Sequence, residues 1–223
     1  MIRYRTSDGS PALDPGNARA LQAMMMALFF RQQAAEALRV GERAVALNPN
    51  DTELLAEYGW RLGMSGEWAR GGALIEQALA RNPARAGYYH TTLALVAYMR
   101  GDNGRALSEI RQADLDKLSF FHGIAAIIYA EAGMRTEAAE AAVRFATLNP
   151  RFVADPEGEL TKRNYRPEDR ARIIEGLRKA GLPIQPPPRS VGERALGAAG
   201  RRRTFPGRTV RYRRFCRRRR REA

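Results

Sequence analysis

Apolar residues along most of this chain recur at the spacing of one face of a helix. Between residues 18 and 30 they occupy positions i, i+3, i+4 and i+7, which predicts an amphipathic helix; they are Leu21, Met24, Met25 and Leu28. A second helix is expected over about 34–47, with small residues along one stripe, where a neighbouring helix can approach closely. It ends at Asn48-Pro49, because proline disfavours helical geometry in the residue before it.

The same helix ending returns 34 residues later, at Asn82-Pro83, and a fixed spacing of this kind indicates a structural repeat. Residues 52–83 repeat the two-helix pattern around a glycine-containing turn. A third unit begins near Ala86 and a fourth covers 119–150. Four helix–turn–helix units predict an all-α fold in which successive helix pairs stack as an α-solenoid.

The second unit resembles the tetratricopeptide repeat. That pattern has large apolar residues, a leucine, a glycine and a tyrosine on its first helix, then small and aromatic residues and a closing proline on its second. The matching positions here are Leu55, Tyr58, Gly59, Leu62, Gly71, Ile75, Ala78 and Pro83. The departures exchange one apolar or small residue for another of different size.

The two ends of the chain differ from the repeats. Residues 1–17 carry turn signals without periodicity and are expected to form a loose arm. The superhelical repeat domain is expected over 18–183, and it includes a capping helix at 167–180 with proline in its first turn and Gly181 after its end. Residues 184–223 hold almost no large apolar side chains, which predicts a disordered Pro/Arg-rich tail.

Charge is concentrated in that tail. The chain carries a formal net charge of +14, yet residues 189–223 alone hold 14 arginines and two glutamates, and the preceding 188 residues hold 24 basic and 22 acidic side chains. The repeats are therefore nearly neutral, and their partners need not be polyanions. The single cysteine, Cys216, favours a reducing compartment. The start has no signal-peptide pattern, and the longest apolar run is too short to span a membrane, so we expect a cytoplasmic protein.

Two interpretations of the basic tail remain open. Its arginines could neutralise nucleic-acid phosphates while interleaved aromatic residues stack on bases; the candidates are Arg201, Arg202, Arg203, Arg211, Arg213, Arg214, Arg217 and Arg218. Alternatively, the run comes from a shifted or extended reading frame, since GC-rich DNA read out of frame yields Arg, Gly, Pro and Ala. The use of arginine without a single lysine slightly favours this second interpretation.

The resemblance implies a ligand-binding groove on the concave face, lined by the second, fifth, ninth and twelfth residues of each unit. The candidates at these positions are Arg19, Gln22, Met26, Phe29, Glu53, Trp60, His90, Phe120 and Ile127. Only one of them is basic, so a clamp for a terminal carboxylate is not expected. Met26, Phe29, Trp60, His90 and Phe120 instead suggest an apolar, aromatic groove for a helix or an extended peptide. An equally weighted alternative is that these five side chains pack against the arm, the capping helix or each other. Trp68, on a second helix, is expected to pack between repeats.

The sequence offers no catalytic or metal-binding pattern. His90 and His122 have no Cys, Asp or Glu near them at the spacing of a metal site, and no phosphate-binding loop, nucleophile elbow or HExxH motif is present. We therefore expect a non-enzymatic protein without cofactor or metal that binds a protein or peptide partner. The alternative function is polyanion binding through the tail.

The third and fourth units resemble a narrower group, the C-terminal repeat modules of bacterial regulators that carry an adenylate cyclase or winged-helix domain. The resemblance covers about 48–183 and rests on Tyr88-Tyr89-His90, Phe120-Phe121-His122, Leu148-Asn149-Pro150 and the 176–182 stretch. It implies a regulatory or scaffolding module of a signalling protein, detached from its output domain. No catalytic residue transfers, because neither output domain is present here.

Overall fold

The computed structural model describes residues 16–113 and 119–184. The predicted arm and basic tail lie outside these residues, apart from the arm's last two positions and Ile184. The chain divides into one compact unit up to Ile184 and a second unit beyond it. Only the first unit is described below.

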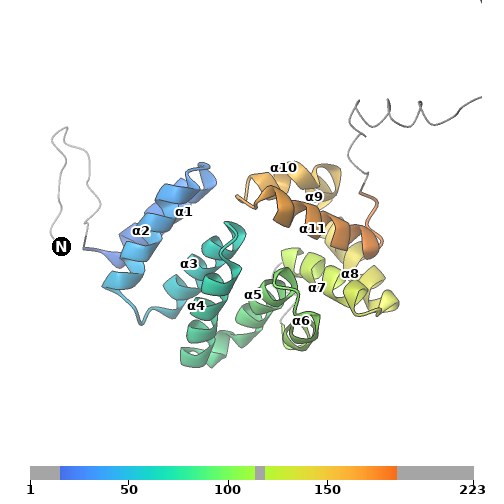
Figure 1. The fold of residues 1–223 in the computed structure, drawn as a ribbon, viewed down its shortest axis with the longest axis horizontal. Coiled ribbons are helices and arrows are strands. Elements are labelled where there is room, and N and C mark those ends of the chain that lie inside the picture. Colours follow the sequence, from blue (N-terminus) through green and yellow to red (C-terminus); the bar gives the residue numbers. More distant parts are fainter. Residues whose placement is uncertain (1–15, 114–118, 185–223) are drawn as a thin grey trace, which may run out of the picture. The chain divides into compact units, whose positions relative to one another are not determined.

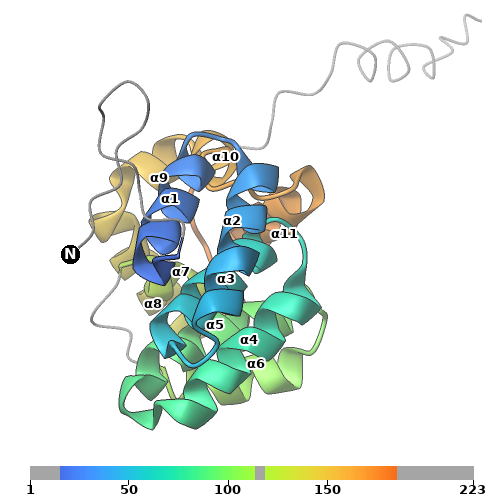
Figure 2. The ribbon, with the colours of Figure 1, turned by 90° about the vertical axis from the view of Figure 1, so that its left-hand side faces the viewer.

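The described part is all-α, and within it no strand occurs (Figure 1). Its helices are α1 Ala18–Phe30, α2 Ala34–Leu47, α3 Thr52–Met64, α4 Trp68–Arg81, α5 Ala86–Met99, α6 Asn103–Ile110, α7 Ser119–Glu131, α8 Arg135–Leu148, α9 Pro150–Ala154, α10 Pro156–Thr161 and α11 Pro167–Lys179, with a 3-10 turn at Pro83–Arg85. The first eight pack as the pairs α1/α2, α3/α4, α5/α6 and α7/α8, and each pair contacts the next (Figures 1 and 2). This is the α-solenoid predicted from the sequence.

Each helix pair turns at a residue with left-handed backbone geometry. In the second, third and fourth units this residue is glycine, and in the first it is Gln32, with φ of 65°. The second helix begins two residues later in all four units. The common register lets positions in different units be compared directly. Side-chain caps at Asn17, Asp51 and Asp102 begin α1, α3 and α6 by accepting hydrogen bonds from backbone N–H groups in the first turn.

The segment from α9 to α11 packs back against the turns of the repeats. The α11 helix lies mainly against α7, and Arg172 donates hydrogen bonds from its guanidinium to the backbone oxygens of Tyr98 and Met99 at the end of α5. Trp68 packs here too: it stacks on Tyr165, and its indole N–H donates to Asp169 over 3.2 Å. The last helix, expected to cap the repeats, therefore lies along α7 of the fourth unit, and Trp68, expected between repeats, also contacts this C-terminal segment.

This arrangement explains why α5 and α7 are buried nearly all round. Every residue from Thr91 to Met99 and from Phe121 to Ile128 is buried. A first helix of an open solenoid would expose one face, but α11 covers that face here: a Cβ placed on Gly176 would meet Ile127 and Tyr98. Helices that are apolar on every side are typical of such enclosed positions.

Candidate functional site

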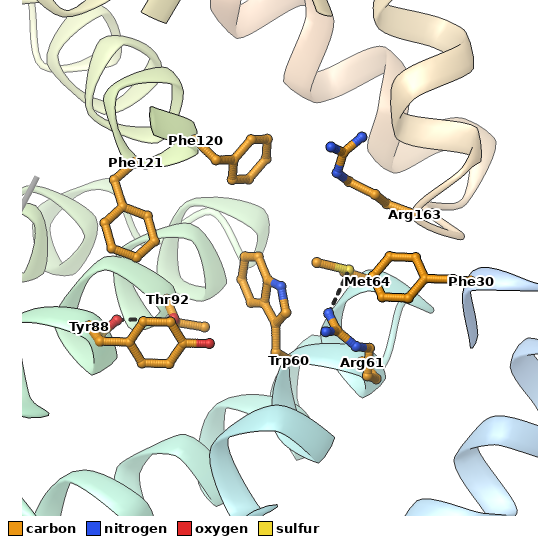
Figure 3. Close-up of a pocket in the computed structure, with 9 residues that line it drawn as sticks. All are labelled: Phe30, Trp60, Arg61, Met64, Tyr88, Thr92, Phe120, Phe121 and Arg163. Carbon is orange, nitrogen blue, oxygen red and sulfur yellow. Dashed lines mark hydrogen bonds between the residues drawn. The ribbon is translucent and has the colours of Figure 1, made fainter. Parts of the chain in front are cut away.

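An aromatic pocket lies among the first helices of the four units (Figure 3). Its volume is about 230 Å³. It is lined by Phe30 from α1, Trp60, Arg61 and Met64 from α3, Tyr88 and Thr92 from α5, Phe120 and Phe121 from α7, and Arg163 from the loop before α11. We call this set the first-helix pocket. Its volume suits one large side chain rather than a drug-sized ligand, whose sites usually begin at about 300 Å³.

Trp60 divides the pocket into two sides. In Figure 3 Tyr88 and Phe121 lie on one side of its ring, Phe120 lies above it, and Phe30, Met64 and the two guanidinium groups lie on the other side. The aromatic side is held by ring packing, because Phe121 contacts Tyr88 at 6.0 Å and Phe120 packs on Phe145 at 6.3 Å between centroids. One side of the pocket is therefore mainly aromatic, and the other carries the guanidinium donors of Arg61 and Arg163.

Arg61 is the buried charge of this site, with 6% of the residue exposed. Glu57 accepts from its Nη2 at 2.9 Å, while its other donors meet the sulfurs of Met26 and Met64 at 3.2 to 3.7 Å. Thioether sulfur is a weak acceptor. The guanidinium also lies over the ring of Phe29 at 5.1 Å, which adds a cation–π attraction. Most of its donors therefore have only soft partners, and an oxygen acceptor would bind them more strongly.

Arg163 reaches the pocket from the C-terminal segment. Its Nη1 donates to the carboxylate of Glu159 at 2.8 Å, and hydrogen bonds from Arg163 and Lys162 hold the pKa of Glu159 below its usual range. The loop that carries Arg163 is tied to the first unit. Gln32 donates from its amide to the backbone oxygen of Lys162 at 2.8 Å, and Asn164 donates to the backbone oxygen of Phe29 at 2.7 Å.

Comparison with solved structures agrees with this helix arrangement. The tetratricopeptide-repeat protein YrrB, whose structure is described as having an unusual peptide-binding site, superimposes with a TM-score of 0.50 at 19% identity, over 83% of this chain and 93% of YrrB. The fold is that of the tetratricopeptide repeat. An RS-1 MamA double mutant gives 0.51 at 16% identity, over 84% of this chain and 99% of that one. The structure of MamA 41-end from Desulfovibrio magneticus RS-1 also superimposes with a TM-score of 0.51, at 17% identity, over 76% of this chain and 95% of that chain.

Identities this low establish the repeat fold and nothing finer. No family model matches the sequence, and a search of curated proteins finds no significant match. None of the described helices is long and apolar enough to cross a membrane. Within residues 16–113 and 119–184, no group of three or more His, Cys, Asp or Glu side chains is placed to hold a metal ion.

Of the nine residues predicted for the groove of the repeat, two line the first-helix pocket: Trp60 and Phe120. Met26 and Phe29 lie beneath it against Arg61, and Phe29 is fully buried. Ile127 is buried under α11, because the C-terminal segment covers that part of the groove. Neither Phe29 nor Ile127 is therefore accessible to a ligand in this structure.

The remaining four predicted residues are engaged elsewhere. Arg19 forms ion pairs with Asp51 and Glu53 at 3.2 Å and donates to Gln22, so this polar cluster joins the first two units. His90 lies 2.7 Å from a carboxylate oxygen of Glu109 on α6, which directs its ring toward the second helix of its own unit. The basic residues predicted to bind polyanions lie outside the described residues.

Several pocket residues do not occupy the second, fifth, ninth or twelfth position of a unit and were therefore not predicted. Tyr88 and Phe121 belong to the aromatic motifs at the starts of the third and fourth units, so the sequence did carry a signal for them. Arg61 directly follows the ninth position of its unit. Arg163 had no signal in the repeat pattern, because it comes from a segment that folds back from outside the four units.

Proposed function

We propose that this protein is a non-enzymatic peptide-binding solenoid of the cytoplasm whose recognition site is the first-helix pocket. The observation that carries the proposal is the convergence of aromatic side chains from three successive first helices on one accessible hollow: Trp60, Tyr88, Phe120 and Phe121. Aromatic residues in a concave site supply a large contact area with little loss of side-chain entropy.

The size and polarity of the pocket favour one large apolar side chain of a partner as the anchor. Because α11 covers the inner faces of α5 and α7, a long helix could not lie along the whole groove, so a short extended segment fits better. Arg61 and Arg163 border the other side of the pocket, where they would receive carbonyl or carboxylate oxygens beside the anchor. The peptide-binding site described for YrrB supports this class of function by analogy of fold only.

The finer proposal is that the protein serves as a regulatory module of a bacterial signalling system. It rests on the sequence resemblance, and two of the motifs that carry it, Tyr88-Tyr89-His90 and Phe120-Phe121-His122, supply three of the pocket residues. In this proposal the natural ligand is a segment of the output protein.

The test begins with selection of a random-peptide phage library on the full-length chain. We expect enriched peptides to share a large apolar residue. Trp60→Ala should weaken their binding about thirtyfold or more, the effect of losing an interface residue worth ~2 kcal/mol. Leu47→Ala is the matched control, because Leu47 is an exposed apolar residue remote from the pocket lining. Equal binding of the enriched peptides to Trp60→Ala would move the site elsewhere.

A further inference from the structure

The outer face of α8 differs from the faces that join the inner units. Counted from the first residue of each second helix, the ninth residue is Glu42 in the first unit and Glu76 in the second. Each of these carboxylates pairs with an arginine of the next second helix: Glu42 with Arg70 and Glu76 with Arg105, both at 2.6 Å. The ninth position therefore faces the following unit.

The arginines of these pairs stand at a fixed position too, the third residue of each second helix. At the junction between the third and fourth units the signs at these positions are reversed: Arg111 directly follows the end of α6, and the third residue of α8 is Glu137. Here Arg111 donates to the sulfur of Met134 at 3.8 Å. The first two internal junctions thus form ion pairs at these two positions, and the third carries one basic and one acidic residue there. A further unit stacked on α8 would therefore be expected to meet a charged residue at the ninth position of α8.

The fourth unit breaks this pattern. Its ninth residue is Val143, and 67% of this residue is exposed. Beside it on the same helix lie Ala139 and Leu148, and Leu148 is 52% exposed. The fifth residues of the preceding second helices, Leu38, Gly72 and Leu107, are buried or partly buried, whereas the corresponding Ala139 is exposed. An apolar end face is unusual, because the terminal units of solenoids generally have a polar outer surface.

We propose that this α8 face binds a second copy of the chain about a two-fold axis, with the two α8 helices antiparallel. Such an axis near Val143 brings the two valines together. With the axis one residue before Val143, Glu140 of each copy stands opposite Arg144 of the other, because the two are equally far from residue 142, and each valine lies only one residue from the axis. The face is therefore complementary to itself in both apolar contact and charge, which is the requirement for a two-fold interface.

Head-to-tail stacking of copies does not fit the same residues. In that arrangement Val143 would meet the third residue of the next copy's α2, which is Glu36. A valine against a carboxylate reproduces none of the three internal junctions and would desolvate a charge without a partner. The two-fold arrangement also closes at two copies, whereas head-to-tail stacking would continue into filaments.

The interface is small, so the dimer should be weak. A single helix face falls below the ~800 Å² per partner of a standard-size interface. We expect dissociation constants in the micromolar range or above. Sedimentation equilibrium of the nuclease-treated full-length chain, from low micromolar to submillimolar concentration, should show a reversible monomer–dimer equilibrium. A wild-type chain that is monomeric throughout, or that forms larger assemblies, would overturn the proposal.

Substitutions in the α8 face separate this pairing from unspecific association. Val143→Glu places two carboxylates at the axis and should raise the dissociation constant about tenfold or more. Leu47→Glu is the control, because Leu47 is 47% exposed on α2, outside the proposed face. If both variants weaken association equally, the α8 face is not the interface.

The charge pairs give the sharpest test. Glu140→Arg and Arg144→Glu should each weaken self-association, because each places like charges opposite one another. An equimolar mixture of the two variants should associate more strongly than either alone, since one copy then carries two basic and the other two acidic residues. A mixture that associates no better than its components would refute the antiparallel pairing. Peptide binding at the first-helix pocket should stay unchanged in every variant.

Discussion

Gly71→Ala should destabilise the protein even though alanine is the better helix former. Gly71 on α4 lies against Gly59 on α3, and a Cβ added at Gly71 would come within 2.3 Å of the Gly59 backbone oxygen. That oxygen belongs to the α3 backbone and cannot rotate away, so the two helices would have to separate. The propensity gain of ~1 kcal/mol is opposed by an overpacking cost of about 3 kcal/mol. The net loss should be ~2 kcal/mol.

Gly104→Ala is the matched control. Gly104 lies in the first turn of α6, where the nearest atom to an added Cβ is a carboxylate oxygen of Asp102 at 3.9 Å. Nothing opposes the propensity gain there, so this variant should be unchanged or up to ~1 kcal/mol more stable. The two substitutions are chemically identical, and only their surroundings give them opposite effects.

Urea unfolding and thermal melts followed by circular dichroism would measure both variants. For a domain of this size, a loss of 2 kcal/mol lowers the melting temperature by roughly 4–8 °C. The reasoning would be refuted if Gly71→Ala were as stable as the wild type, because the α3/α4 contact would then have room for a methyl group. If Gly104→Ala were less stable than the wild type, the helix-propensity gain of ~1 kcal/mol assigned to this substitution would be wrong.

Three further predictions follow from other contacts. Asp169→Ala should lower the free energy of unfolding, measured in urea, by about 2–3 kcal/mol, because it leaves the buried indole N–H of Trp68 without its acceptor and removes an acidic residue from the first turn of α11. An unchanged urea midpoint would contradict this role of Asp169. Tyr165→Phe should be neutral or stabilising at pH 7, since its buried hydroxyl finds no hydrogen-bond partner among the described residues. Burial raises the pKa of Tyr165, so wild-type stability should be complete below about pH 10 and fall as the pH rises further, when the unfolded state ionises; Tyr165→Phe should reduce that loss, and an equal loss would show that other groups cause it. A chain ending at Ile184, which is itself buried, should lose most of its affinity for a labelled single-stranded oligonucleotide and the salt dependence of that binding; unchanged binding would exclude the tail as the binding element.

The repeated part of the fold could be predicted because its signals are local. The Asn-Pro endings, the small residues on facing helices and the turn before each second helix gave the helix pairs and their order. Gly59 and Gly71 show how specific this signal is, since both match repeat positions and the structure brings them into backbone contact. Each of these features depends on residues within one unit or in adjacent units.

The path of the C-terminal segment could not be predicted from such signals. The bond between Trp68 and Asp169 joins residues about a hundred positions apart, and no repeat rule specifies that pairing. As a result, Ile127 was assigned to an open groove although α11 covers it. One sequence feature did point that way: α5 and α7 are apolar on nearly all sides, which is typical of enclosed helices.

His90 shows the limit of assigning a site by position alone. Its place in the unit is a groove position, but its ring lies beside Glu109 of α6, because a nearby carboxylate attracts the imidazole more than an apolar pocket does. Trp60 and Phe120 are large apolar side chains without a polar partner of this kind, and both line the pocket.

Fluorescence of Trp60 is the most direct test of the first-helix pocket. The chain has two tryptophans, so Trp68→Phe leaves Trp60 as the only one. Titration of this variant with a phage-selected peptide should shift the Trp60 emission and saturate at the same concentration as binding measured by anisotropy of the labelled peptide. If anisotropy shows saturable binding while the Trp60 emission stays constant, the peptide binds outside the pocket and the central claim is wrong.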